Sequence, residues 1–152
     1  MSYSFPDRST FEEKLNAKLL ALKAPGSFDS YMDPELAAYD YDEKSLTLRF
    51  HVKPWMLNVD GILHGGLYAC MADCVMGSIS CFYTGTSITP SVSLHINFIR
   101  PAKAGDVLYF RGQVRSIGRT MVHATMTAWR EDVPDKELLT GTGVFFNPAS
   151  RA

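Results

Sequence analysis

The stretch GILHGGLYACMADCVMGSISCFYTG, residues 61–85, decides the fold of this protein. Between positions 62 and 83 the only formal charge is Asp73, and an apolar stretch of about 20 residues is long enough to cross a bilayer. This stretch, however, contains five glycine and serine residues, holds Asp73 near its centre and has no flanking Lys or Arg. We therefore expect a helix that is buried on most of its sides by the rest of the protein.

Downstream of this helix the apolar periodicity changes to that of a β-strand. Residues 91–98, SVSLHINF, place an apolar side chain at every second position, which is typical of a half-buried strand. Because the candidate strands are joined by short turns, the last of them expected at residues 133–136, we expect neighbours in sequence to pair antiparallel. The other three candidates are residues 107–116, 120–130 and 138–146.

Upstream of the central helix the sequence predicts one further helix and one hairpin. The helix, residues 9–24, begins with Ser9 and Glu12 at the spacing of a capping box and ends before Pro25. A loop or short turn is expected at residues 27–34. The hairpin consists of two strands and the turn between them, at residues 36–41, 46–52 and 42–45 respectively.

This order of elements predicts an α+β fold in which a curled antiparallel sheet wraps one long central helix. Residues 1–34 would add a helix and a loop to a main domain of residues 35–152, all within one globular unit. A single helix covers only one face of a sheet. The other face and the sheet edges must be solvated, paired with another strand or covered by another subunit, so we expect at least a dimer.

The charge balance excludes some classes of partner. Lys and Arg number 15 against 16 Asp and Glu, which gives a formal net charge of −1. That balance argues against sequence-independent nucleic-acid binding, which depends on clustered cations. The N-terminus lacks the basic and apolar segments of a secretory signal. We therefore expect a soluble, cytoplasmic protein that binds neither nucleic acid nor a membrane.

The three cysteines cannot all pair within one chain, which favours free thiols in a reducing compartment. Cys70, Cys74 and Cys81 lie on one stripe of the expected helix. No second pair of ligands completes a metal site, so packing is the favoured role and no metal is expected. Apolar surroundings also argue against a nucleophilic cysteine, because they raise the pKa of a thiol.

Asp73 is the anomaly of the central helix, because it stands among apolar neighbours in CMADCVM, residues 70–76. A carboxylate is almost never fully buried without a partner. Asp73 either caps another group or faces solvent, or it acts as a base or nucleophile whose pKa is tuned by an enclosed site.

A second candidate, His64-Gly65-Gly66, precedes the helix. Without side chains at the two glycines, backbone N–H groups at a helix start can bind an anion or a developing oxyanion. The glycines could equally serve only a tight turn into the helix, and a lone histidine is weak evidence by itself. Asp73 follows Gly65 by eight residues, or about 12 Å along a helix. If both act on one small group, Gly65 and Asp73 must come from different subunits.

Together these segments resemble the hotdog-fold acyl-CoA thioesterases, in particular the PaaI-like subgroup named after phenylacetic-acid degradation. The resemblance covers residues 46–146. The combination of His-Gly-Gly, an Asp nine residues after His64 and a downstream Phe-x-Arg-Pro is more specific than any one piece. The matching segments are NVDGILHGG at 58–66, MAD at 71–73, NFIRPA at 97–102 and GD at 105–106.

The resemblance implies hydrolysis of acyl-CoA to the free acid and CoA. The Gly65 amide would polarise the thioester carbonyl with help from Asn58, while His64 would be mostly structural. Asp73 of the partner subunit would activate a water as general base, or attack as nucleophile. Ser91 would position that water, unless it is an ordinary solvent-facing serine.

The resemblance also implies a homotetramer, and no cofactor besides the coenzyme A of the substrate. The positively charged candidates could equally be ordinary solvated side chains. The candidates for contacts to coenzyme A are Gly66, Arg100, Lys103, Gly118 and Arg119.

Two other functions and the identity of the acyl group stay open. One is a non-catalytic acyl-CoA binding module, since fold does not decide function. The other is a hotdog hydroxyacyl-thioester dehydratase, although its helix usually supplies a Glu where this chain has Asp73. Tyr68, Phe82, Tyr83 and residues 55–57 offer apolar surface for an acyl pocket or for the core. The N-terminal helix either covers that pocket or packs on the sheet.

Overall fold

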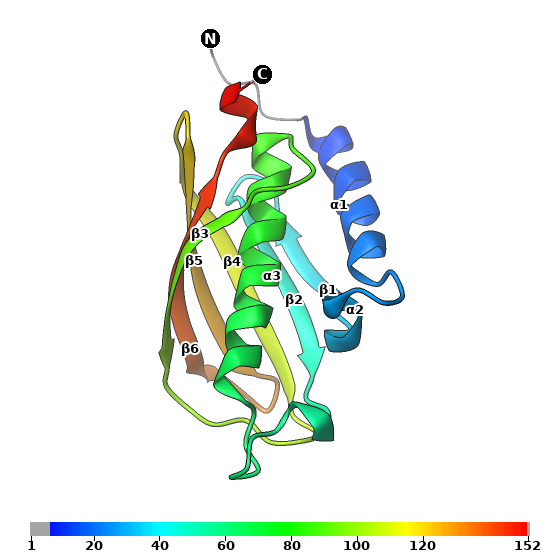
Figure 1. Ribbon diagram of the computed structural model, residues 1–152, viewed down its shortest axis with the longest axis vertical. Helices are drawn as coiled ribbons and strands as arrows, with labels where there is room; N and C mark the ends of the chain where they lie inside the picture. The colour runs from blue at the N-terminus through cyan, green and yellow to red at the C-terminus, as the bar shows by residue number, and fades with distance from the viewer. Residues whose placement is uncertain (1–6, 152) are drawn as a thin grey trace.

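A computed structural model describes residues 7–151, in which a six-stranded antiparallel sheet curls around one long helix (Figure 1). The spatial order of the strands is β1-β2-β4-β5-β6-β3, so β1 and β3 form the two edges. Residues 1–6, with which the expected N-terminal extension begins, lie outside the described residues. The strands are β1 Glu35–Asp40, β2 Ser45–His51, β3 Ser91–Phe98, β4 Val107–Ile117, β5 Met121–Arg130 and β6 Val133–Phe146.

The central helix α3, Gly65–Thr84, lies on the concave side of the sheet, as the sequence predicts. It approaches β4 closely because Gly112 has no side chain. A Cβ there would lie 3.1 Å from Cγ1 of Val75. The helix is long and apolar enough to cross a membrane, yet 61% of that apolar stretch is buried inside the protein. The fully buried side chains of α3 pack on those of β2 and β4. From α3 they include Met71, Val75, Met76 and Ile79, and from the two strands Leu48, Phe50, Leu108 and Phe110.

Two helices precede the sheet and lie beside α3, namely α1, Arg8–Leu22, and α2, Phe28–Met32 (Figure 1). Phe11 anchors α1, because its fully buried ring contacts four aromatic rings. Those rings belong to Tyr39 and Tyr41 near the end of β1 and to Phe82 and Tyr83 of α3.

The predicted start of the first helix is wrong by one or two residues. Asp7 is the N-cap, and its carboxylate accepts a 2.8 Å hydrogen bond from the backbone N–H of Thr10. Ser9 is already helical and donates its hydroxyl to the same carboxylate at 2.7 Å. The loop expected at residues 27–34 also differs, because Ser27 caps the short helix α2.

Two predictions about the last four strands are wrong. The antiparallel pairs β4–β5 and β5–β6 are confirmed, but β3 does not pair with β4, because β3 pairs with β6 and β4 pairs with β2 instead. Residues 99–106 therefore carry the chain from one edge into the middle of the sheet. The turn expected at residues 133–136 is instead the start of β6, which follows β5 after only residues 131–132. The hairpin of β1 and β2 is confirmed.

Strand β3 is less covered than its alternating pattern predicts. Leu94 and Ile96 are half-buried against the core, but Val92 is 54% exposed and Phe98 is 57% exposed. One edge of β3 pairs with β6, and no described strand pairs with the other. The unpaired edge of β3, which carries exposed apolar side chains, is therefore a template for pairing with another chain.

Candidate active site

The first turn of α3 is capped by the histidine that precedes it. His64 is the N-cap, and its Nδ1 accepts a 2.9 Å hydrogen bond from the backbone N–H of Gly66. The N–H of Gly65 has no hydrogen-bond acceptor among the described residues. A helix start carries a positive partial charge that favours an anion or a developing oxyanion near its free N–H groups. Of the two glycine amides, only that of Gly65 is therefore available to bind one.

Asn58 lies beside this helix start because its side chain closes the preceding loop. Its Oδ1 accepts hydrogen bonds from the backbone N–H groups of Asp60 and Ile62, at 3.0 Å and 3.2 Å. The side-chain Nδ2 has no acceptor among residues 7–151 and remains a donor. Asn58 and Gly65 thus offer two N–H donors in one place.

Asn58 and Gly65 both line a cavity of about 400 Å³. Tyr68 closes it on one side, where the ring contacts Phe98 at a centroid distance of 5.8 Å and the hydroxyl donates to the carbonyl of Arg100 at 3.3 Å. Burial raises the pKa of Tyr68 to about 12, so the phenol is neutral near pH 7. The residues lining this oxyanion cavity are Asn58, Ile62, Leu63, Gly65, Tyr68, Phe98, Ile99, Arg100 and Pro101.

Asp73 lies farther along α3 and faces the first residue of β3. The Ser91 hydroxyl donates a 2.5 Å hydrogen bond to Oδ1 of Asp73. Asp73 is half-buried and Ser91 is exposed, so the carboxylate is neither sealed in the core nor free in solvent. Ser91 holds one carboxylate oxygen and leaves the other able to accept a hydrogen bond.

A separate cavity of about 330 Å³ receives Asp73. This carboxylate cavity shares no lining residue with the oxyanion cavity. One chain therefore keeps its carboxylate and its N–H donors apart, as their spacing in the sequence predicts. The residues lining the carboxylate cavity are Lys18, Leu22, Asp29, Asp73, Cys74, Gly77, Ser78, Cys81, Ile88, Thr89, Pro90 and Ser91.

The N-terminal helices contribute three lining residues that were not expected from the sequence. Lys18 and Leu22 come from α1 and Asp29 comes from α2, so the N-terminal helices form one of its walls. The signal that could have found them is weak, because Leu22 belongs to the apolar stripe of α1 but nothing in the sequence indicates which element that stripe contacts.

The candidate coenzyme A contacts lie at opposite ends of the folded molecule. Arg100 lines the oxyanion cavity and donates a hydrogen bond from its guanidinium to the carbonyl of Glu137, and Lys103 is exposed in the same loop. Gly118 and Arg119 form the turn between β4 and β5, at the end of the sheet where α3 ends (Figure 1). One chain therefore does not bring all five candidates together.

The cysteines are suited to packing rather than to chemistry. Cys74 and Cys81 are buried, Cys70 is half-buried, and all three are free. Burial and the nearby Asp73 raise the pKa of Cys70, and burial together with Asp29 raises that of Cys74. Both thiols are therefore protonated and weakly nucleophilic at neutral pH. Among residues 7–151, no group of three or more His, Cys, Asp or Glu side chains is placed to hold a metal.

Comparison with known proteins decides the family. A family model described as the thioesterase superfamily matches residues 60–136, which are about half of the chain and include Gly65, Asp73 and Ser91. The chain belongs to the thioesterase superfamily.

Similar proteins support this thioesterase family assignment. A bovine acyl-coenzyme A thioesterase, THEM4 of Bos taurus, is 36% identical over 73 residues, which are 48% of this chain and 29% of that protein. The chain spans only about a third of the length of the curated relatives that it matches.

Two solved structures share the fold of this thioesterase family member. The PaaI protein of the E. coli phenylacetic acid degradation operon has a TM-score of 0.76 at 20% identity, covering 90% of this chain and 95% of that one. A protein of Streptococcus mutans, smu.793, bound to acetyl CoA, has a TM-score of 0.67 at 21% identity, covering 75% and 87% of the two chains. These similarities confirm the predicted hotdog fold.

Proposed function

We propose that this protein hydrolyses acyl-CoA thioesters to the free acid and CoA, at a site completed by two copies of the chain. The observation that carries the proposal is the separation of two half-sites. The free Gly65 amide and Asn58 lie in one cavity, and the Asp73–Ser91 pair lies in another. Thioester hydrolysis needs an oxyanion site and an activated water, and each half-site supplies one of them.

Strand β3 connects the two half-sites and suggests how a second copy unites them. Its first residue, Ser91, binds Asp73. Its last residue, Phe98, lies against Gly65, because a Cβ on that glycine would be 3.7 Å from the ring. Each end of this edge strand thus carries one half-site.

Two β3 strands that pair antiparallel about a two-fold axis would place the first residue of one opposite the last residue of the other. An axis between Leu94 and His95, the centre of the strand, sets Ser91 of each copy opposite Phe98 of its mate. Asp73 of one copy then lies next to Gly65 of the other, at two equivalent sites. The exposure of Val92 and Phe98 supports this pairing, since it would cover both.

At such a site the reaction proceeds by direct attack of water. The Gly65 N–H and the Asn58 Nδ2 donate hydrogen bonds to the thioester oxygen, where negative charge develops. Asp73 of the other copy accepts a proton from water as the water oxygen bonds to the carbonyl carbon. The tetrahedral adduct then breaks its C–S bond, and the proton on Asp73 passes to the CoA thiolate. Free acid and CoA leave, and no other cofactor is required.

The same two-fold pairing supports the assignment of the coenzyme A contacts. Antiparallel strands reverse the ends of the two copies, so the β4–β5 turn of one copy lies at the end where the other copy holds Gly65. Arg119 of one copy and Arg100 or Lys103 of the other would then flank one substrate. Phosphate groups favour such cations. We also propose that two such dimers form a homotetramer, because the resemblance implies one. We propose a cytoplasmic location because the cysteines are free.

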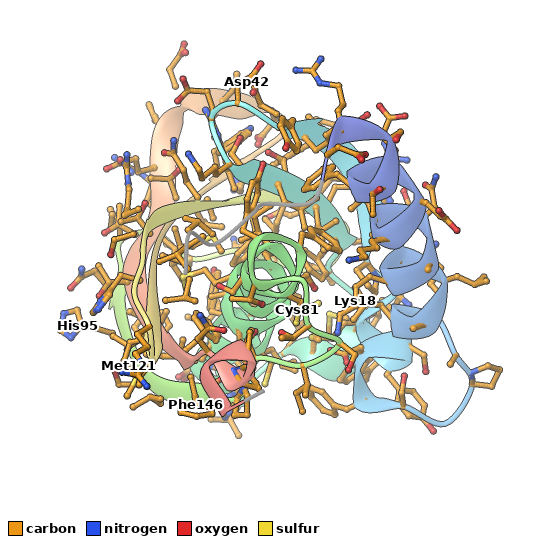
Figure 2. All side chains as sticks on the ribbon, turned by 90° about the horizontal axis from the view of Figure 1, so that it is seen from above. Lys18, Asp42, Cys81, His95, Met121 and Phe146 are labelled. Carbon is orange, nitrogen blue, oxygen red and sulfur yellow. The ribbon has the colours of Figure 1, made fainter. Side chains whose placement is uncertain are left out.

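The observations favour hydrolysis over dehydration. The helix α3 contains no Glu, and Nδ1 of His64 is engaged by Gly66. His95 projects outward from the sheet, away from α3 (Figure 2). The helix therefore lacks the Glu that dehydratases of this fold usually supply, and its one carboxylate, Asp73, is assigned to activating water. A binding module without catalysis remains the competing proposal, because the same donors could hold an acyl-CoA.

Replacing Asp73 by Asn separates hydrolysis from binding. We expect thiol release from acyl-CoA to fall by about 100-fold or more, because a general base contributes about that much, while acyl-CoA still binds. Asp29→Asn alters the other carboxylate of the same cavity and should cost much less, because Asp29 does not contact Ser91. Binding without turnover by the unaltered protein would reject hydrolysis in favour of the binding module.

A further inference from the structure

A third cavity, of about 430 Å³, lies between α1 and the second half of α3. It shares two lining residues with the carboxylate cavity, Lys18 of α1 and Cys81 of α3. Figure 2, which looks along α3, shows these two side chains in the space between the helices. The third cavity, which we call the helix groove, thus continues the carboxylate cavity away from Asp73.

The chemistry of the helix groove suits an alkyl chain. Ala17 and Ala21 of α1 and Phe82 of α3 line it, and no carboxylate does. Lys14 and Lys18 also line it and make no ion pair among the described residues. A lysine without a partner lays its methylene stem along apolar surface and turns its ammonium to water. The buried Cys81 and Phe82 therefore form the inner wall of the groove, and the exposed Ala17 and Ala21 extend its apolar surface toward a rim that also holds Thr86 and Ser87.

The shape of the path also points to a linear occupant. The carboxylate cavity begins at Asp73 and the helix groove ends at Gly85, about 18 Å farther along α3. A short or single-ring acyl group would fill only the part near Asp73. A flexible unbranched chain can follow the groove and bury its methylene groups along the whole path.

We propose, resting on the hydrolysis proposed above, that the helix groove binds the acyl chain and that the preferred substrates carry an unbranched aliphatic chain long enough to pass Cys81. The thioester lies at Asp73 and the chain runs between α1 and α3. Lys18 stands at the junction of the two cavities and sets the width of the passage. The N-terminal helix is then a wall of the substrate site, held in place by Phe11.

Ala17→Trp tests this proposal by filling the helix groove from α1. Each methylene kept from burial lowers the second-order rate constant about fourfold, so we expect kcat/KM for dodecanoyl-CoA to fall by about tenfold or more. The same constant for butanoyl-CoA should not change. Asn16→Trp is the matched control, because it adds an indole at an exposed neighbouring position that lines none of the three cavities.

An equal loss for both substrates, or no loss for either, would overturn the groove assignment while leaving hydrolysis intact. The same comparison in the Asp73→Asn background uses calorimetric dissociation constants in place of rates. There, Ala17→Trp should weaken binding of dodecanoyl-CoA about tenfold and leave butanoyl-CoA unaffected. That result would support the groove even if the unaltered protein hydrolysed neither substrate, in which case only the proposed hydrolysis would fail.

Discussion

Ser91 and Asp73 are joined by a 2.5 Å hydrogen bond between the serine hydroxyl and the carboxylate Oδ1. The bond links the first residue of the edge strand β3 to the middle of the central helix α3. It fixes one carboxylate oxygen of a residue that lines the carboxylate cavity. The relationship explains how a carboxylate in an apolar helix can be both stabilised and available to a water molecule.

Ser91→Ala should impair catalysis without impairing binding. A hydrogen bond to a charged group contributes about 1.5–3 kcal/mol, so we expect kcat to fall by about tenfold or more with KM little changed. Ser93→Ala removes an exposed hydroxyl two residues along the same strand and should leave kcat unchanged. Steady-state kinetics on one acyl-CoA measure both. A Ser91→Ala enzyme with the kcat of the unaltered protein would show that the hydrogen bond does not serve the reaction.

Val92→Lys should separate the copies that we expect to pair through β3. A lysine on an edge strand opposes pairing with another strand, because the charge would be buried. Light scattering after size exclusion should show a smaller assembly than that of the unaltered protein, with loss of thioesterase activity. Val59→Lys introduces the same charge at a valine that is fully exposed and lies outside β3, and should leave the assembly intact. An assembly unaffected by Val92→Lys would mean that the copies meet elsewhere.

Tyr68 should make the protein less stable in alkali. Its pKa is about 12 in the folded chain, against about 10 for an ordinary phenol. Between these values the unfolded state loses its proton first, so the free energy of unfolding falls as pH rises through that range. Urea unfolding at about pH 9 and about pH 11 should show a smaller fall for Tyr68→Phe than for the exposed control Tyr31→Phe. Equal falls would contradict the role of burial at Tyr68.

Gly65→Pro should remove the oxyanion donor and preserve the helix. Position 65 is the first residue of α3, where proline is favoured, and His64 has the extended backbone that a following proline requires. The change deletes one N–H, which should lower kcat by about 100-fold. Gly65→Ala keeps the N–H, and its Cβ would make only an ordinary contact with Phe98. Equal activities of the two variants would rule out the amide.

Local sequence signals located the elements but not their order in the sheet. The buried helix was predicted at 62–83 from its composition and found at Gly65–Thr84, because a long apolar segment with one charge has few alternatives. The pairing of β3 with β6 could not be predicted, since strand order depends on contacts between distant segments. Residues 99–106 have the composition of a short turn, although they cross to the middle of the sheet.

For the candidate site, too, the sequence indicated some residues and not others. Gly65 and Asp73 stood out because their residue types are unusual in their local setting, whereas Asn58 was indicated only by the resemblance to the thioesterases. The cap of α1 was misplaced because Asp7 and Ser9 are both good N-cap residues and lie two positions apart. Lys18 gave no signal, because a lysine on an amphipathic helix is ordinarily solvated. Only the packing of α1 beside α3 brings it to the carboxylate cavity.

The most direct test of the central claim mixes two inactive variants. Asp73→Asn lacks the carboxylate and Gly65→Pro lacks the oxyanion amide, so each alone should be inactive. If the site combines residues of two copies, a mixed dimer regains one complete site. Refolding equal amounts together should then restore about a quarter of the unaltered activity, because half of the dimers are mixed and each has one working site. A mixture as inactive as its components would show that the two residues do not act across subunits.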